Sequence, residues 1–134
     1  RGMMRILFVC KYNRFRSKVA EAIFLALNKN KKIKVRSRGT ILDKLKPYVA
    51  RSVIKIMKKK GYKVEGKPKK ISKKDISWSD LIIIVADNVR LKSRNVVYWK
   101  ISDVSQEDIR GIKERVNKIE KRIKKLVLNL NEKV

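Results

Sequence analysis

The chain has no histidine and a single cysteine among its 134 residues. Without histidine it has no imidazole base, which excludes hydrolases that depend on a Ser-His or Cys-His pair. The shortage of both residue types also excludes a zinc site of clustered cysteine and histidine ligands, and we predict no metal and no cofactor. One cysteine cannot form an internal disulfide, which favours a reducing, cytoplasmic setting. Any chemistry must therefore use the thiol, carboxylates, lysine, arginine or tyrosine.

Acidic residues and long apolar runs are also scarce. The chain has 12 Asp and Glu against 38 Lys and Arg, which gives a net charge of +26. Such a charge attracts anionic partners and strengthens salt-dependent binding to phosphate-rich polymers, so non-specific polyanion binding is open. The lysines are spread along every predicted helix, which is typical of a solvated surface. No segment approaches the ~20 apolar residues that span a bilayer, so no membrane partner is expected.

The length and the order of the apolar segments predict one α/β domain. We assign it to residues 3–134 and interpret Arg1 and Gly2, which precede a methionine, as an expression remnant. Apolar runs predict strands at residues 4–9, 33–37, 81–85 and 96–101. Helical spacing predicts helices at residues 17–28, from Pro47 to Gly61, and from Ser105 onward. This alternation favours a three-layer, doubly wound fold with a central four-stranded parallel sheet flanked by helices, and 81–85 is expected to be the central strand.

Capping patterns and sheet topology refine this expectation. Ser72 with Asp75, and Ser105 with Asp108, predict capping boxes for a short helical turn and for the last helix. The last helix has an apolar stripe at 3–4 spacing, which is expected to cover one face of the sheet. The loops after the first, second and fourth strands should gather at the carboxyl edge of the sheet, where such folds bind ligands. The sequence gives no indication of the oligomeric state.

The only cysteine, Cys10, follows the first apolar run directly and precedes a loop that leads into a helix. Backbone N–H groups and the helix dipole attract an anion at such a position. The same surroundings favour the thiolate, the nucleophilic form of cysteine. Arg16 adds a planar fork of donors that suits a phosphate better than a lysine does. The segment therefore predicts a thiolate that faces a phosphoryl group.

Four segments together resemble the low-molecular-weight protein tyrosine phosphatases. The loop Cys10–Ser17 is similar to the family's phosphate-binding loop, and residues 37–40 to its Ser-Ala-Gly-Thr segment. Residues 80–87 resemble the family's third strand with its flanking aspartates, and residues 101–103 the approach to its catalytic aspartate. The resemblance covers nearly the whole chain. It implies a flavodoxin-like fold and hydrolysis of phosphotyrosine or small aryl phosphates through a phosphocysteine intermediate.

The resemblance also implies roles for individual residues. Cys10 would be the nucleophile, Arg16 would stabilise the charge on the phosphoryl oxygens, and Asp103 would be the general acid. Asn13 and Ser17 would shape the loop, and Ser17 is also a candidate helix N-cap. Lys11 would contribute mainly a backbone N–H, and Tyr12, Arg14 and Phe15 would line the mouth of the pocket. The expected phosphate-binding residues are thus Lys11, Tyr12, Asn13, Arg14, Phe15, Arg16 and Ser17.

Two residues depart from the family pattern. Tyr12 replaces a glycine, which would strain the loop if that position required a positive φ. Val104 replaces the proline that follows the catalytic acid. Asp108 is a rival for the role of acid, although it is better interpreted as a helix cap. Asp80 and Asp87, which flank the third predicted strand, are expected to fix loops.

Three other functions remain open. A thiol-dependent arsenate reductase shares the same loop, but its chemistry passes a disulfide along further cysteines, so this chain would need an external thiol. Arginine phosphatases share the scaffold, and Arg14 at the pocket wall would repel a guanidinium substrate. The net charge also permits a module that binds nucleic acid or another polyanion on an inactive phosphatase scaffold. Such a module needs aromatic side chains among the basic ones, and the nine aromatic residues are scattered.

Overall fold

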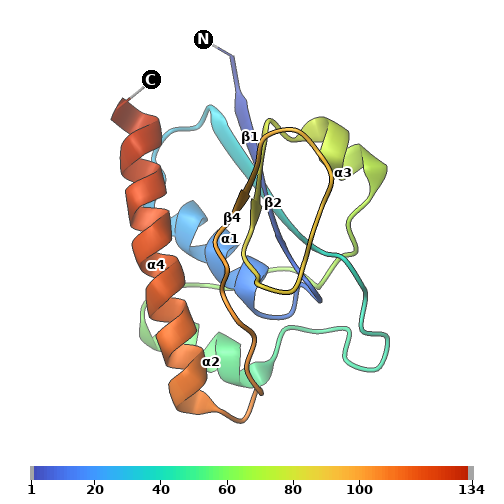
Figure 1. Cartoon of the computed structure of the whole chain (residues 1–134). Coiled ribbons are helices and arrows are strands. Elements are labelled where there is room, and N and C mark those ends of the chain that lie inside the picture. The colour runs from blue at the N-terminus through green and yellow to red at the C-terminus, as the bar shows by residue number, and fades with distance from the viewer. Residues whose placement is uncertain (1, 133–134) are drawn as a thin grey trace.

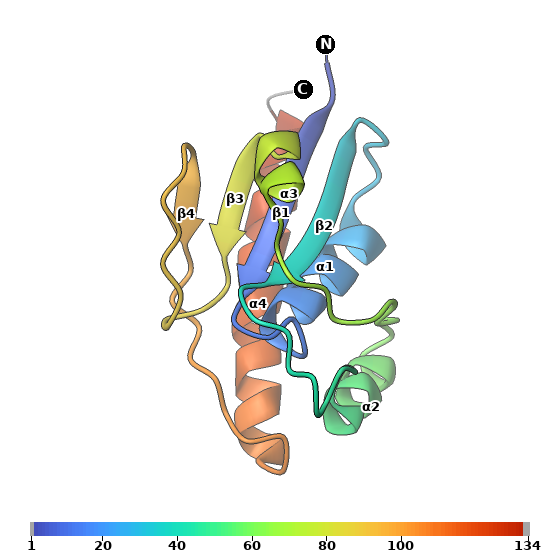
Figure 2. The same cartoon turned by 90° about the vertical axis from the view of Figure 1, so that its right-hand side faces the viewer.

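A single parallel sheet forms the centre of the computed structural model, which describes residues 2–132. Arg1 of the predicted remnant, and the last two residues of the predicted domain, lie outside the described residues. The strand order is β2-β1-β3-β4, with bounds Met4–Cys10 (β1), Ile33–Gly39 (β2), Leu81–Ile84 (β3) and Val96–Tyr98 (β4). The predicted doubly wound α/β fold is confirmed, and β1 and β3 share the central position (Figures 1 and 2).

The fourth strand is shorter than predicted. It ends at Tyr98 rather than Ile101, because Lys100 adopts a left-handed backbone with φ 49° that interrupts the extended conformation. The chain beyond Tyr98 makes different contacts. The Ile101 carbonyl accepts hydrogen bonds from the Asp87 N–H, at 3.1 Å, and from Arg16, at 2.8 Å. The residues expected to continue the strand therefore shape the loop at the carboxyl edge.

Four helices complete the fold, with bounds Arg16–Leu27 (α1), Arg51–Lys59 (α2), Lys73–Trp78 (α3) and Ile109–Glu132 (α4). The prediction that Pro47 opens the second helix is wrong. Residues 48–50 instead bind the loop after β1, because the Tyr48 carbonyl accepts from Arg14 Nε at 2.8 Å and the Ala50 N–H donates to the Arg14 carbonyl at 3.4 Å. None of the described helices is long and apolar enough to cross a membrane.

The cap of α4 also differs from the prediction. Asp108, not Ser105, is the residue before the helix, and its Oδ1 accepts the Gly111 N–H at 2.9 Å. The Ser105 hydroxyl instead donates to Glu107 Oε1 at 2.8 Å. The stripe of α4 packs inward as expected, with Ile112, Val116, Ile119 and Ile123 fully buried.

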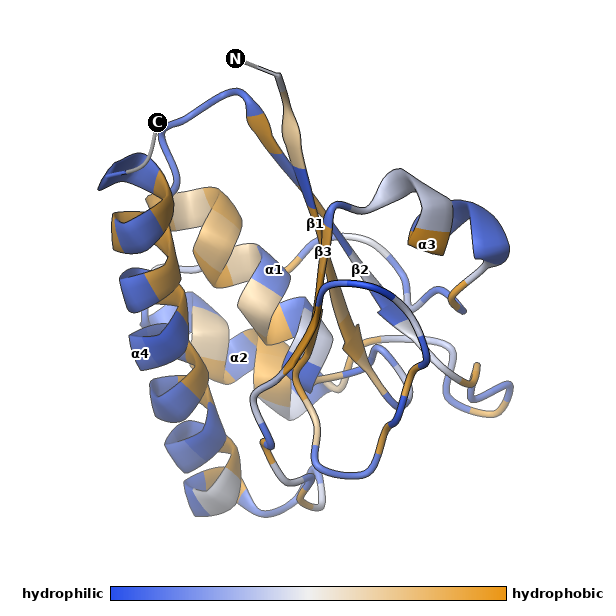
Figure 3. Ribbon diagram, turned by 45° about the horizontal axis from the view of Figure 1, so that its top comes forward, coloured by the Kyte–Doolittle hydropathy of each residue, from blue (hydrophilic) through white to orange (hydrophobic). Residues whose placement is uncertain are grey.

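Side chains of β1 alternate between two hydrophobic clusters, one on each face of the sheet. Ile6 and Phe8 point into the larger cluster beneath α1, α2 and α4. Leu7 and Val9 point into the smaller cluster on the α3 side. Figure 3 shows the apolar side of α4 turned toward this core and its hydrophilic side turned outward. Both faces of β1 are therefore dry, as its continuous apolar run predicts.

The short helix α3 is fixed to the sheet by one buried carboxylate. Asp75 forms the predicted capping box with Ser72, and it also accepts from Arg38 Nε at 3.0 Å and Arg36 Nη1 at 3.2 Å, both from β2. Burial raises the pKa of the Asp75 carboxyl, but the hydrogen bonds from Ser72 and the charge of Arg38 outweigh burial and keep that pKa below its ordinary value of 3.8.

Asp75→Asn should therefore destabilise the protein in a pH-dependent way. At neutral pH we expect its free energy of unfolding to fall by about 1–3 kcal/mol, because charge-assisted hydrogen bonds are lost. A carboxyl whose pKa is lower in the folded state stabilises above the unfolded pKa, and this contribution disappears as the pH falls through the folded pKa. The difference in free energy of unfolding between the wild type and Asp75→Asn, measured by urea unfolding, should therefore become smaller below about pH 3.8. Glu114→Gln, at an exposed carboxylate, is the control, and a pH-independent deficit would show that the charge of Asp75 is not its cause.

Candidate active site

The loop after β1 forms a cradle of backbone donors. It leads directly into α1, whose N-cap, Phe15, makes no side-chain capping bond. Within the part of the chain that the structure describes, the N–H groups of residues 11–16 have no hydrogen-bond acceptor. Unpaired donors at a helix N-terminus bind anions, because the N–H dipoles and the helix dipole both favour negative charge there. The loop is therefore suited to a phosphate.

Cys10 lies at the base of this cradle. Its side chain is almost fully buried, with the Sγ atom 2.9 Å from Ser17 Oγ. Ser17 Oγ accepts a hydrogen bond from Asn13 Nδ2 at 2.6 Å, which leaves its own hydrogen available to the sulfur. The alternative N-cap role for Ser17 is wrong, because α1 already begins at Arg16. The serine hydroxyl instead forms a hydrogen bond with the Cys10 thiol.

Asn13, not Tyr12, has the left-handed backbone in the loop. Its φ is 56°, a conformation that asparagine tolerates better than most residues, and Tyr12 has no positive φ. The Asn13 side chain is fully buried, donates to Ser37 Oγ at 3.0 Å and accepts from the Lys69 N–H at 3.0 Å. Tyrosine in place of glycine therefore does not strain this loop.

Gly39, at the end of β2, allows the loop to pack against the sheet. A Cβ atom at this position would lie 2.7 Å from Asn13 N, 2.7 Å from Tyr12 C and 2.9 Å from the Lys11 carbonyl oxygen. These are backbone atoms, so the clash cannot be relieved by a side-chain rotation. The loop conformation thus depends on glycine in a neighbouring strand.

We expect Gly39→Ala to displace the loop and lower its affinity for phosphate. The overpacking should cost about 1–3 kcal/mol of stability. Misplaced donors should lower kcat/KM for p-nitrophenyl phosphate by about 10-fold and weaken inhibition by orthophosphate. The control is Gly2→Ala, because a Cβ there would meet nothing within 4 Å. Unchanged kinetics in Gly39→Ala would show that the loop tolerates the shift.

Arg16 is held rigidly beneath the cradle. Its side chain is 2% exposed, and Nη1 donates to the Ile101 carbonyl at 2.8 Å and to Asn88 Oδ1 at 3.3 Å. Two carboxylates flank the guanidinium, with Asp87 Oδ1 3.7 Å from Nη1 and Asp103 Oδ2 3.7 Å from Nη2. The Arg16 guanidinium is therefore oriented by contacts from the loops after β3 and β4.

Asp103 lines the same cavity as Cys10, whereas Asp108 does not. The Asp103 carboxylate is half-exposed, and its Oδ1 accepts the Val104 N–H at 2.9 Å. A proline at position 104 has no N–H, so this bond results from the departure from the family pattern. The structure thus brings the nucleophile and acid candidates together and leaves Asp108 as a helix cap.

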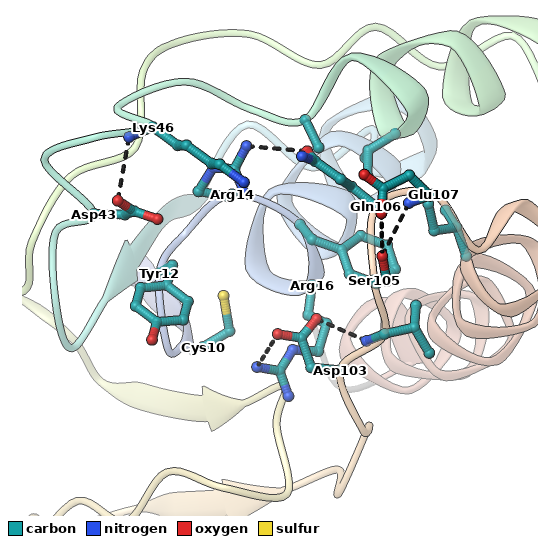
Figure 4. A pocket seen from close by; sticks show the side chains of 15 residues that line it. Cys10, Tyr12, Arg14, Arg16, Asp43, Lys46, Asp103, Ser105, Gln106 and Glu107 are labelled. Carbon is teal, nitrogen blue, oxygen red and sulfur yellow. Dashed lines mark hydrogen bonds and ion pairs between the residues drawn. The ribbon is translucent and has the colours of Figure 1, made fainter.

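The cavity above Cys10 has a volume of about 310 Å³. Tyr12 and Arg14 form one part of its wall, and Phe15 is only 8% exposed and belongs to the inner wall rather than the predicted mouth. Lys11 does not line the cavity. The rim is mixed in charge, with Asp43, Lys46, Arg14 and Glu107 around the opening (Figure 4).

Some contributors could not be identified from the sequence. Asp87 was expected only to fix a loop, but it forms an ion pair with Arg16, and Asn88 beside it was not predicted at all. Their position directly after a strand at the carboxyl edge was the available signal. Among residues 2–132, no group of three or more His, Cys, Asp or Glu side chains is placed to bind a metal ion.

Comparisons with known proteins agree with this geometry. The model of the family described as low molecular weight phosphotyrosine protein phosphatase matches residues 5–134. An arsenate reductase from Archaeoglobus fulgidus is 30% identical, with 91% of this chain and 98% of that chain covered and a TM-score of 0.75. Among curated protein sequences, no significant match was found.

Two further solved structures share the fold at lower identity. A low molecular weight protein tyrosine phosphatase from T. tengcongensis is 22% identical, with a TM-score of 0.81 over 94% of this chain and 99% of that chain. The YwlE arginine phosphatase from Geobacillus stearothermophilus is 19% identical, with a TM-score of 0.84 over 97% of this chain and 94% of that chain. At such identity these likenesses show the fold alone.

Proposed function

Because the chain belongs to the low molecular weight phosphotyrosine protein phosphatase family and is a cysteine-dependent phosphomonoester hydrolase, we propose that it acts on phosphotyrosine and small aryl phosphates, with Cys10 as nucleophile. The observation that supports the proposal is the meeting of Cys10, the buried Arg16 and Asp103 around one cavity with unpaired backbone donors. A reducing, cytoplasmic setting would keep the thiol free.

The first step transfers the phosphoryl group to sulfur. The Cys10 thiolate attacks phosphorus, a P–S bond forms, and the P–O bond to the leaving group breaks. Asp103 gives its proton to the departing oxygen. Arg16 and the N–H groups of residues 11–16 stabilise the charge on the equatorial oxygens. The Ser17 hydroxyl donates to the sulfur before the attack.

The second step releases orthophosphate. Asp103, now a carboxylate, removes a proton from a water molecule that attacks phosphorus on the side vacated by the leaving group. The P–S bond breaks, and the electron pair returns to Cys10 as thiolate. No metal is needed, because Arg16 and the backbone donors neutralise the phosphoryl charge.

The pocket wall favours an aryl over a guanidino substrate. Arg14 is fixed there by the Tyr48 carbonyl and by Gln106 Oε1, at 3.3 Å, so its positive charge cannot swing far away. A phosphoarginine side chain would place a second guanidinium beside it. The Tyr12 ring offers an apolar surface for an aromatic leaving group instead.

We therefore expect kcat/KM for a phosphotyrosine peptide to exceed that for the matched phosphoarginine peptide by at least about 10-fold. Steady-state phosphate release from both peptides measures this ratio. Arg14→Gln should lower this ratio of kcat/KM values. Arg90→Gln, at an exposed site that does not line the cavity, should leave the ratio unchanged. A preference for phosphoarginine would overturn the proposed substrate and leave the phosphocysteine chemistry intact.

A second candidate activity is the reduction of arsenate, since the Archaeoglobus fulgidus protein named an arsenate reductase is 30% identical to this chain. The chain has only one cysteine, so a disulfide could form only with an external thiol such as glutathione or thioredoxin. Arsenite production coupled to one of these thiols would support this activity. Its absence, together with turnover of aryl phosphates, would leave the phosphatase reaction.

A further inference from the structure

The outer surfaces of α2 and α4 form a basic face that the phosphatase reaction does not use. Residues 51–60 and 109–132 together carry twelve exposed lysine and arginine side chains and two exposed carboxylates. This ratio of six to one is higher than that of all exposed side chains in residues 2–132, which number 28 basic and 8 acidic. We call these exposed side chains the α2/α4 basic face. Figure 3 shows that the outward side of α4 is hydrophilic along the helix.

The burial of α4 fixes the direction of this face. The apolar stripe that contains Val116 and Ile119 is fully buried against the core, so the opposite side, with Lys118, Lys121 and Lys125, points to solvent. These three lysines are separated by three and four residues, or about 4.5–6 Å along the helix axis. The charges therefore form a row along a rigid helix about 36 Å long.

A groove of about 280 Å³ lies between the two helices. It is lined by Ile56, Lys59, Lys60, Lys113 and Asn117. Lys60 Nζ donates to Asn117 Oδ1 at 3.0 Å and pairs with Glu120 Oε1 at 3.0 Å, so the groove wall is fixed by polar contacts. The row of charges on α4 thus continues across the groove onto α2.

Two carboxylates of α4, Glu114 and Glu120, lie close in the sequence to the groove residues Lys113 and Asn117, but they do not neutralise the face. Glu120 is half-buried, where it pairs with Lys60 and accepts a hydrogen bond from the Tyr62 hydroxyl. Burial and the adjacent Glu120 raise the pKa of Tyr62 to about 12, which keeps the hydroxyl protonated as the donor. The charge of Glu120 is therefore directed inward, and the surrounding lysines remain in excess.

We propose that the α2/α4 basic face binds the phosphate backbone of double-stranded nucleic acid without regard to sequence. Along one strand of a duplex, phosphates recur about every 3.4 Å, so lysines 4.5–6 Å apart can each reach a separate phosphate. Residues 51–60 and 109–132 contain no aromatic side chain, which disfavours single strands, whose bases need stacking partners. The apolar stripe of α4 is buried in the core. The exposed apolar side chains of the two helices, Ile54, Ile109 and Leu128, each adjoin a charged or polar residue and lie well apart in the sequence, which disfavours a membrane surface as the partner.

The test measures binding of a fluorescent, random-sequence duplex of about 20 base pairs, twice the length that α4 spans. Fluorescence anisotropy at several salt concentrations gives the dissociation constant and its salt dependence. The variant carries Lys113→Gln, Lys118→Gln, Lys121→Gln and Lys125→Gln. We expect it to bind at least about 30-fold more weakly at low salt and to lose about 3–4 from the slope of log K against log salt.

A matched control removes the same charge outside the α2/α4 basic face. It carries Lys67→Gln, Lys70→Gln, Lys73→Gln and Lys74→Gln, all exposed in α3 or in the segment that leads into it. This variant should bind within about 3-fold of the wild type, because its lysines contact no phosphate in the proposed complex. Equal losses in both variants would overturn the proposal, since the whole field of the protein and not one face would then bind the duplex.

Two further measurements distinguish duplex binding by this face from binding at the active site and from binding to a membrane. Cys10→Ser should bind the duplex as tightly as the wild type. The α4 variant, which carries the four lysine substitutions at positions 113, 118, 121 and 125, should hydrolyse p-nitrophenyl phosphate normally. Duplex binding and phosphatase activity can therefore be lost independently of each other. Vesicles that contain phosphatidylserine test the membrane alternative. Tighter binding to vesicles than to duplex, lost in the α4 variant, would overturn nucleic acid as the partner.

Discussion

Cys10→Ser is expected to lower kcat for p-nitrophenyl phosphate by at least about 10⁴-fold. A serine hydroxyl keeps its proton at neutral pH, and the chain has no histidine that could remove it. No other cysteine can replace the nucleophile. Steady-state release of p-nitrophenol by both proteins measures the effect.

The same variant should keep its fold and its cradle. Serine is only slightly smaller than cysteine, and the backbone N–H groups of residues 11–16 and the guanidinium of Arg16 are unaffected. Orthophosphate should therefore still protect Cys10→Ser against thermal unfolding, as a ligand bound only to the folded state does. Equal turnover by the two proteins would refute the phosphocysteine mechanism, whereas no turnover by either would leave a polyanion-binding module on an inactive scaffold.

Asp103→Asn should slow the hydrolysis of phosphotyrosine by about 10²–10⁴-fold, the usual share of general acid catalysis. The loss should be far smaller for p-nitrophenyl phosphate, whose leaving group departs without a proton. Comparing kcat for the two substrates in the wild type and the variant isolates the proton transfer. A merely structural role for Asp103 beside Arg16 would slow both substrates equally.

Asp108→Asn is the matched control for this prediction. Asp108 caps α4 and does not line the cavity, and asparagine is also a good N-cap, so stability and turnover should change little. If Asp108→Asn abolished turnover while Asp103→Asn had no effect, the acid would have been assigned to the wrong carboxylate. The assignment of Cys10 would remain.

The sequence by itself determined the fold and the core of the candidate site. Apolar runs such as residues 4–9 can be buried only as inner strands, and the alternation with helices fixes a parallel sheet. Because parallel strands end at one edge, Cys10 and Asp103 could be expected in the same cleft although they lie far apart in the sequence. The structure confirms the fold and brings both residues to that edge.

Only the tertiary structure decided the details that depend on contacts between distant segments. The sequence could not show that Asn13 rather than Tyr12 would take the positive φ, because the Ser37 and Lys69 contacts that hold Asn13 come from other elements. The start of α2 was mispredicted for the same reason, since residues 48–50 make hydrogen bonds to Arg14 and the helix begins only at Arg51. Local propensities describe neighbours in the chain, whereas these conformations are set by donors and acceptors that folding brings together.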